Sequence, residues 1–274
     1  MAYETLVYDT AERVATITLN RPEKMNALNA QLWAELADAL RTADADREVR
    51  AVVLAANGRA FCAGADMSHN VGPNAIERGV FEWFEREQEG EQVHRLFRDM
   101  TKPIVAAVQG YALAWGLEVA CMCDFIFASD QAKFGAPEIR HGSTINTLLP
   151  WLVGIQNARY LLYSGDVIDA QEAYRIGLAF RLVPHDQLAA EVQRFARRLA
   201  MIPPAALRLN KRQLDGMQDM AGMHNALRYG ALAGAICHAM QELAETPDGR
   251  NLGEIRRTQG MRVFLEARDA PYRE

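Results

Sequence analysis

The chain has few cysteines and lacks the long hydrophobic runs that cross membranes. Only four of its 274 residues are cysteine, and none has the C-x-x-C or Cys/His spacing of a zinc site. Disulfide scaffolds are small and rich in cysteine, so we expect reduced, buried thiols here. Polar or charged residues interrupt every apolar stretch before it reaches the roughly 18 residues of a membrane span. We therefore expect a soluble protein with no membrane partner.

An excess of positive charge is also missing. The chain has 30 lysines and arginines against 35 acidic residues, which gives a formal net charge of -5. Proteins that bind nucleic acids normally carry a basic surface, so we expect no nucleic-acid partner. Residues 1–5 carry neither a basic segment followed by an apolar one nor the arginine-rich character of a transit peptide. We expect a cytoplasmic location.

Several common catalytic signatures are absent. The sequence has no phosphate-binding G-x-x-x-x-G-K-[ST] loop, no G-x-G-x-x-G after a strand, no H-E-x-x-H and no G-x-S-x-G. The six histidines are scattered, and only His141, close after a Pro-Glu pair, lies in a segment of interest. A surface or hydrogen-bonded polar histidine is the competing interpretation of that residue.

The apolar pattern predicts a layered α/β core followed by helices. Residues 6–8 and 14–19 are typical of a β-hairpin. The short apolar runs at residues 52–56, 104–108 and 124–128 are typical of buried strands. Helical spacing begins after Asn29, a good N-cap, and returns at residues 81–100. Strands that alternate with helices indicate an α/β fold over residues 1–198.

Beyond Pro203 the pattern is helical, at residues 205–217, 220–244 and 251–267. We assign residues 199–274 to a C-terminal helical region. Its many small residues suggest oligomerisation, and simple core packing is the alternative.

Two turns made of small residues are candidates for a catalytic site. Residues 61–66 follow a predicted strand, and residues 110–118 connect a strand to a helix. The first amides of a helix have no partner within it, so such turns can present N–H groups. Two N–H groups aimed at one point would stabilise a developing oxyanion, as thioester chemistry requires.

Two glutamates accompany these turns. Glu118 lies just inside the second turn and Glu138 follows Phe134-Gly135-Ala136-Pro137. Partial burial would raise the pKa values of both side chains toward the range that suits proton transfer. One ionised and one protonated carboxyl could deprotonate water and protonate a carbon. Ordinary buried or capping glutamates are the alternative interpretation.

At these residues the sequence resembles the crotonase (enoyl-CoA hydratase/isomerase) superfamily, from about residue 10 to 270. Single pieces of the resemblance are weak, but their order and spacing together are specific. The pieces are Asn20-Arg21-Pro22 with Asn26-Ala27-Leu28, Phe61-Cys62-Ala63-Gly64-Ala65-Asp66, Lys102-Pro103-Ile104-Val105-Ala106-Ala107-Val108-Gln109-Gly110, Glu118 through Cys123-Asp124, Phe134-Gly135-Ala136-Pro137-Glu138, Leu162-Tyr163-Ser164-Gly165 and Gly260 through Arg268.

The resemblance implies a spiral of ββα units whose C-terminal helices build a homotrimer or a dimer of trimers. It implies acyl-CoA thioesters as substrates, with no metal or redox cofactor. By position, Ala63 and Trp115 would supply the oxyanion-hole amides, Glu118 would activate water and Glu138 would protonate the α-carbon. The CoA channel would be lined by Asn26, Ala27, Ala63, Gly64, Ala65 and Asp66. The two glutamates together favour hydration of a 2-enoyl-CoA.

Two departures from the family pattern keep other reactions open. Ala114-Trp115-Gly116 replaces a run of glycines, so the Trp115 side chain either fills the acyl pocket or turns into the core with its amide intact. The segment at residues 142–150 replaces a glycine-rich stretch. Isomerisation, hydrolysis or decarboxylation of an acyl-CoA, and a non-catalytic CoA-ester-binding oligomer, are the alternative functions. Arg256, Arg257 and Arg262 form either a contact for a CoA phosphate or a solvated face.

Overall fold

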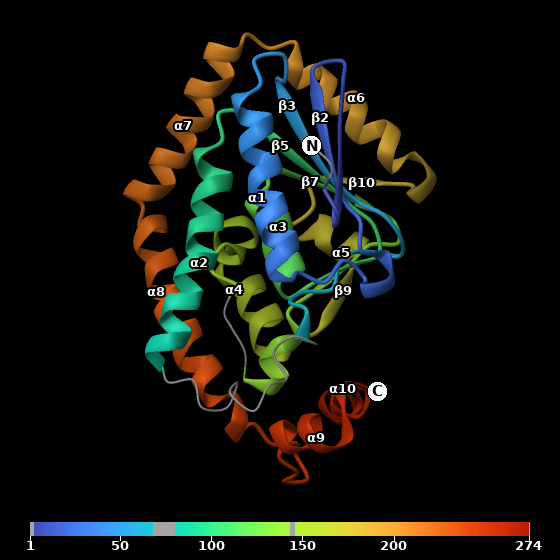
Figure 1. Ribbon diagram of the computed structural model, residues 1–274, viewed down its shortest axis with the longest axis vertical. Coiled ribbons are helices and arrows are strands. Elements are labelled where there is room, and N and C mark those ends of the chain that lie inside the picture. The colour runs from blue at the N-terminus through green and yellow to red at the C-terminus, as the bar shows by residue number, and fades with distance from the viewer. Residues whose placement is uncertain (1–2, 68–79, 143–145, 274) are drawn as a thin grey trace.

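The computed structural model describes residues 3–67, 80–142 and 146–273, and its core repeats one strand–strand–helix unit (Figure 1). Both strands of the first unit join a six-stranded sheet; in the next three units the first strand joins that sheet and the second joins a four-stranded sheet. This arrangement confirms the expected spiral of ββα units. In spatial order, the larger sheet contains β1 (Leu6–Ala11), β2 (Val14–Leu19), β3 (Ala51–Ala56), β5 (Ile104–Val108), β7 (Phe125–Ser129) and β10 (Arg181–Val183), and the smaller contains β4 (Ala60–Cys62), β6 (Tyr111–Leu113), β8 (Lys133–Gly135) and β9 (Val167–Asp169).

The predicted hairpin is present as β1 and β2, which pair antiparallel with Leu6 opposite Leu19. Glu12 and Arg13 in its two-residue turn both have positive φ, 49° and 66°. Such a turn matches the right-handed twist of the strands it joins. From β2 to β10, each neighbouring pair in the larger sheet is parallel.

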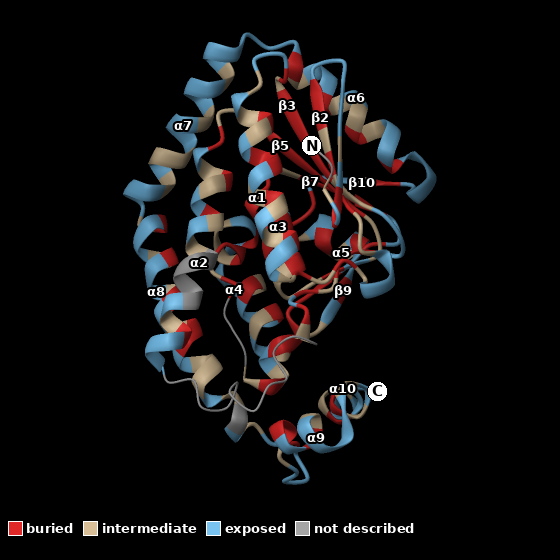
Figure 2. Ribbon diagram, in the orientation of Figure 1, coloured by how far each residue is buried: buried red, intermediate tan, exposed pale blue. Residues whose placement is uncertain are grey.

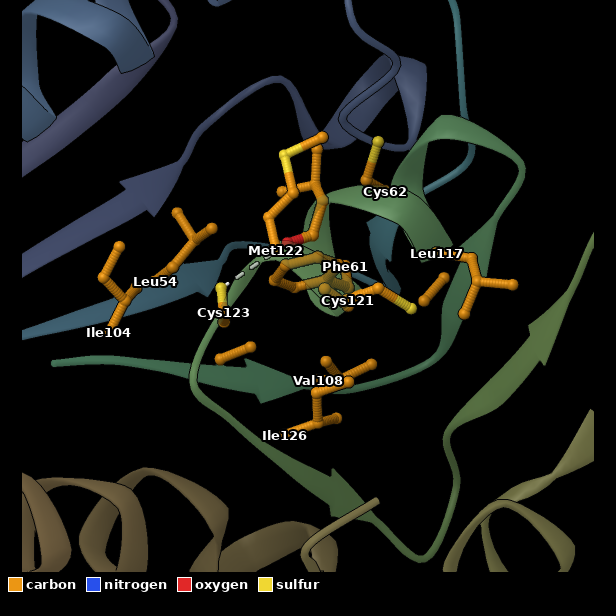
Figure 3. Close-up of a cluster of buried hydrophobic side chains, with 14 of the residues drawn as sticks. Leu54, Phe61, Cys62, Ile104, Val108, Leu117, Cys121, Met122, Cys123 and Ile126 are labelled. Carbon is orange, nitrogen blue, oxygen red and sulfur yellow. Dashed lines mark hydrogen bonds between the residues drawn. The ribbon is translucent and has the colours of Figure 1, made fainter. Parts of the chain in front are cut away.

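The larger sheet is buried on both faces, which explains the continuous apolar runs of its central strands. Along β3, Val52 and Leu54 pack on the main core, whereas Ala51 and Val53 pack on a second cluster beneath α6 (Leu188–Ala200). Figure 2 shows these strands as almost entirely buried. The main core lies on the face toward the smaller sheet and α3 (Trp115–Met122), and it includes Leu54, Phe61 and Leu117 (Figure 3).

The helices of the core have capping and burial patterns that can be traced to sequence. The predicted N-cap Asn29 is confirmed, because its side chain accepts a hydrogen bond from the Leu32 amide. In the helix at residues 80–99, Trp83, His94 and Phe97 are buried, and Val93 and Leu96 are partly buried against the main core. The remaining core helices are α1 (Ala30–Ala45), α2 (Val80–Asp99), α4 (Leu149–Ser164) and α5 (Ala170–Arg175), with 3-10 turns η1 (Pro22–Lys24), η4 (Pro137–His141) and η5 (His185–Gln187).

The C-terminal segments are helical, as predicted. The helices and turns are α7 (Pro204–Met220), α8 (Met223–Met240), η6 (Gln241–Leu243), α9 (Leu252–Gln259), α10 (Met261–Asp269) and η7 (Ala270–Tyr272). Figure 1 shows α8 alongside α2, with α9 and α10 at the end of the molecule away from the α6–α7 connection.

The prediction of one helix over residues 251–267 is wrong. Gly260 has φ 85° and ψ 173°, which separates α9 from α10. The assigned boundary at residue 198 lies in the last turn of α6, and the division into core and helical region stays a prediction. In the described part of the chain, no helix has the length and apolarity to cross a membrane.

Candidate active site

The two small-residue turns meet in space. A Cβ atom built on Gly116 would stand 2.1 Å from the carbonyl oxygen of Cys62, and one built on Gly64 would stand 3.7 Å from the amide nitrogen of Trp115. No side chain fits between the turns at Gly116. The turn after β4 therefore lies directly against the start of α3.

Trp115 is the first residue of α3, so its N–H has no acceptor within the helix. The preceding residue, Ala114, has φ 51° and ψ −123°, and its side chain makes no capping hydrogen bond. This conformation is one that residues with a Cβ rarely adopt. The Trp115 N–H therefore lies next to the turn at residues 63–66, where an oxyanion-hole donor was predicted.

The predicted role of Ala63 is contradicted by its hydrogen bond. The Ala63 N–H donates to the carbonyl oxygen of Met25 at 3.0 Å, so it is already used within the protein. Leu28 forms main-chain hydrogen bonds with the residues on either side of Ala65. The Leu28 N–H donates to the carbonyl oxygen of Gly64 at 2.8 Å, and the Leu28 carbonyl oxygen accepts from the N–H of Asp66 at 2.8 Å. The Ala65 amide takes no part in this bridge and points away from Leu28, since alternate peptide groups of a strand face opposite ways.

A cavity of about 720 Å³ opens beside these turns. Six of the nine predicted site residues line it, namely Ala27, Ala63, Ala65, Asp66, Trp115 and Glu138. Among the described residues, Asn26, Gly64 and Glu118 are absent from its lining. The wall is completed by α9, α10 and neighbouring segments through Lys24, Met25, Met67, Trp83, Leu113, Ala114, Pro137, His141, His238, Gln241, Arg256, Arg257, Gly260, Met261, Leu265 and Arg268.

Asn26 supports the cavity wall rather than lining it, which corrects its predicted contact with CoA. Its side chain is fully buried, donates to the carbonyls of Asn57 and Ala60 at 2.9 and 2.8 Å, and accepts from the Arg21 amide at 2.8 Å. Its φ is 54°, a conformation in which asparagine is enriched. The side chain ties the loop at residues 20–28 to the edge of β4.

Asp66 lines the cavity but is paired within the protein. Its carboxylate lies 2.9 Å from the guanidinium of Arg21. Arg21 also donates to the carbonyl oxygen of Ala27. This ion pair holds the turn at residues 63–66 against the loop that carries Ala27.

Glu138 is a buried acid at the cavity wall. It follows Pro137 in η4 and is 8% exposed, and its Oε2 atom has no hydrogen-bond partner within the described structure. Burial raises its pKa to about 8, and the charge of Glu118 adds to that increase. Glu138 is therefore protonated at neutral pH and can donate a proton.

Glu118 lies one turn into α3 and is 6% exposed. Its Oε1 atom is 2.8 Å from Nε2 of His94, which belongs to α2. The two glutamates lie close enough for the charge of one to raise the pKa of the other. The structure thus brings the two predicted carboxyls together.

His94 is a site residue that the sequence analysis missed. The sequence does contain one signal: His94 lies three residues before Phe97, on the same helical face. Both side chains are buried in the structure. A histidine on the apolar face of a predicted helix therefore indicated a buried polar contact.

The side chain of Trp115 packs into the protein. Its ring meets that of Trp33 edge-on at 5.6 Å between centroids and lies 6.1 Å from that of His94. Packing of the ring against the main core favours the inward orientation of the two left open by the sequence, while Trp115 is only partly buried and also lines the cavity. Its N–H is a main-chain group that any residue except proline supplies.

Basic side chains surround the same cavity. His141 is 7% exposed, and burial together with the nearby charges of Arg268 and Arg256 lowers its pKa to about 3, so it is neutral. Of the predicted basic face, Arg256 and Arg257 line the cavity, whereas Arg262 is exposed elsewhere. This positive wall is suited to an anionic ligand.

The cysteine beside the site is not a nucleophile. Cys62 is fully buried, and burial raises the pKa of its thiol to about 12. A thiol with that pKa stays protonated at neutral pH, and only a thiolate is strongly nucleophilic. Cys62 is therefore not available as a nucleophile beside this cavity.

Residues 9–274 match the family model described as enoyl-CoA hydratase/isomerase. The fold, the paired turns and the two buried carboxyls agree with that match, and the chain belongs to the enoyl-CoA hydratase/isomerase family.

Its relatives within the family include hydratases. The chain is 37% identical over 278 residues to crotonyl-CoA hydratase from Syntrophomonas wolfei, with 99% of both proteins covered. It is 33% identical to short-chain-enoyl-CoA hydratase from Clostridium acetobutylicum, covering 88% of this chain and 92% of that protein. The crystal structure of an enoyl-CoA hydratase/isomerase from Xanthobacter autotrophicus superposes with a TM-score of 0.90 at 34% identity, with both chains fully covered.

Proposed function

We propose that this protein adds water across the double bond of a 2-enoyl-CoA thioester to give a 3-hydroxyacyl-CoA. The observation that carries the proposal is the pair of neighbouring buried carboxyls, of which Glu138 has a pKa of about 8. Hydration needs one base for water and one acid for carbon, and such a pair provides both. Relatives named as hydratases over nearly their full length support the same reaction.

In the proposed reaction the thioester oxygen accepts hydrogen bonds from two main-chain amides. We assign these donors to Trp115 and Ala65, because the Ala63 N–H is occupied. The amides stabilise the enolate that forms when C3 of the substrate is attacked. Preorganised donors of this kind contribute about 10²–10³-fold each to the rate.

The two glutamates then divide the proton transfers. Ionised Glu118 takes a proton from water as the water oxygen bonds to C3. Protonated Glu138 gives its proton to C2, and the carbon–carbon double bond becomes single. After this step Glu118 carries a proton and Glu138 is ionised, so a proton must pass from one to the other before the next turnover.

The CoA part of the substrate is assigned to the positive wall of the cavity. Lys24, Arg256 and Arg257 lie along it, and phosphate groups favour such side chains. The chemistry needs no metal or redox cofactor, and that expectation remains part of the proposal.

A homotrimer or dimer of trimers in the cytoplasm is the proposed state of the enzyme. Large apolar side chains are exposed on α7 and α8, among them Leu209, Met220 and Tyr229. Burial of such side chains between subunits would favour association.

One observation favours a second candidate. Glu118 is absent from the described lining of the cavity, whereas Glu138 lines it. A single carboxyl group that, in its ionised form, takes a proton from one carbon and returns it to another would isomerise the double bond instead of hydrating it.

The deciding experiment follows the loss of the enoyl thioester absorbance with a panel of 2-enoyl-CoA esters, with product masses determined. Hydration adds the mass of one water, whereas isomerisation leaves the mass unchanged. Glu118→Gln and Glu138→Gln should each lower kcat by about 10²–10⁴-fold. Full activity in both variants would exclude the two-carboxyl mechanism.

A further inference from the structure

The hydrogen bond between His94 and Glu118 links two helices at the proposed base. Nε2 of His94 lies 2.8 Å from Oε1 of Glu118, and the two side chains are 7% and 8% exposed. His94 comes from α2, 24 residues before Glu118 in the chain. The pair is therefore a tertiary contact rather than a local feature of α3.

The chemistry of the proposed base defines the direction of this hydrogen bond. A base must be ionised, and an ionised carboxylate can only accept hydrogen bonds. Nε2 of His94 then carries the proton and donates it to Oε1 of Glu118.

The imidazole lies beside the side chain of Trp115. Its ring centroid lies 6.1 Å from that of Trp115, whose ring in turn packs edge-on against Trp33. Trp115 supplies a proposed oxyanion donor through its main chain. His94 thus contacts the side chain of one catalytic residue and hydrogen-bonds another, three residues apart on α3.

We propose that His94 is a positioning residue that orients the Glu118 carboxylate, through the Nε2–Oε1 hydrogen bond, to take a proton from water. The inference rests on the proposed role of Glu118 as the base. Its action passes entirely through Glu118, so its effect should vanish when Glu118 cannot act as a base.

Kinetics of His94→Phe and His94→Gln test this role. Phenylalanine keeps a ring of similar size but has no donor, whereas glutamine keeps an N–H donor. We expect His94→Phe to lower kcat about 100-fold with KM changed less than about threefold, and His94→Gln to retain at least about a tenth of wild-type kcat. His185→Gln, at an exposed histidine, is the matched control and should keep wild-type kinetics.

A double-mutant cycle separates positioning from general structural support. In a Glu118→Gln background, His94→Phe should lower the remaining rate by less than about threefold, because the two residues act as a unit. The same 100-fold loss in both backgrounds, or wild-type kcat in His94→Phe, would overturn the proposal.

A spectroscopic measurement tests the pair without turnover. In ¹⁵N NMR spectra of the wild-type protein, the His94 ring signals, assigned by their loss in His94→Gln, should show a protonated Nε2 and should shift in Glu118→Gln. Unchanged signals in Glu118→Gln would also overturn the proposal. If the wild-type protein hydrates no ester on the panel, the proposed function fails, and these signals still decide whether His94 holds Glu118. The same ¹⁵N signals also decide this question if the His94→Phe variant fails to fold.

Discussion

Gly116 lies against Cys62 so closely that a Cβ atom at residue 116 would stand 2.1 Å from the Cys62 carbonyl oxygen. This contact sets the spacing between the turn after β4 and the start of α3. The three nearest atoms all belong to Cys62, whose turn carries the residues next to the proposed oxyanion site.

Gly116→Ala should therefore force the two turns apart. We expect a loss of about 2 kcal/mol or more in the free energy of unfolding, as for other overpacked sites, and at least about a tenfold fall in kcat as the amides separate. Urea denaturation and steady-state kinetics measure the two effects. Gly216→Ala is the control: a Cβ there meets nothing within 4 Å, and in the interior of α7 the change should stabilise by about 0.5–1 kcal/mol. Equal effects of the two substitutions would contradict the close contact.

The pH dependence of hydration should report the protonation of Glu138. Its pKa of about 8 means that the acid is protonated below that pH and ionised above it. We expect kcat/KM for hydration to fall about tenfold per pH unit above about pH 8. A profile that rises through pH 9 would show that Glu138 does not act as the acid.

Because its pKa is raised, ionisation of Glu138 lowers the free energy of unfolding at alkaline pH. The folded state holds the Glu138 proton more tightly than the unfolded chain does. The resulting contribution to the free energy of unfolding is complete below about pH 4.5 and is lost as pH rises toward about 8. Glu138→Gln, which cannot ionise, should be more stable than the wild type by about 2–4 kcal/mol at pH 8.5 and by less than about 1 kcal/mol at pH 4.5. Urea denaturation at both values measures the difference. Glu23→Gln, at an exposed position, should leave the pH dependence of stability unchanged, and a pH-independent effect of Glu138→Gln would be inconsistent with a titrating buried acid.

Ala114 should be a strained position that glycine relieves. With φ 51° and ψ −123°, its Cβ occupies a conformation that costs about 1–3 kcal/mol. After allowance for the greater freedom of glycine in the unfolded chain, Ala114→Gly should stabilise the protein by about 1 kcal/mol. Ala226→Gly within α8 should have the opposite sign, a loss of about 1 kcal/mol. Destabilisation by both substitutions would mean that Ala114 is not strained.

Much of the larger sheet could be predicted because its strands are long enough to show a pattern. The strands β3, β5 and β7 each carry five or six residues, and burial on both faces makes them continuously apolar. The smaller sheet could not be predicted in this way. Each of its strands has three residues, too few to show a periodicity of two.

The site was predictable in outline but not in its choice of amides. Small residues at 61–66 indicated a turn, and the two glutamates stood out among apolar neighbours. Whether Ala63 or Ala65 faces the ligand depends on which peptide groups bond to Met25 and Leu28, and that pairing joins segments almost 40 residues apart. His94 was missed for the related reason that its partner lies on another helix.

The break at Gly260 folds α10 back so that Met261, Leu265 and Arg268 reach the same cavity as Lys24 and Ala27. The cavity is consequently assembled from segments that lie far apart in the chain. During synthesis on the ribosome, its wall is incomplete until α10 has emerged. A ligand that needs α10 for binding can therefore stabilise the fold only after this helix has been synthesised.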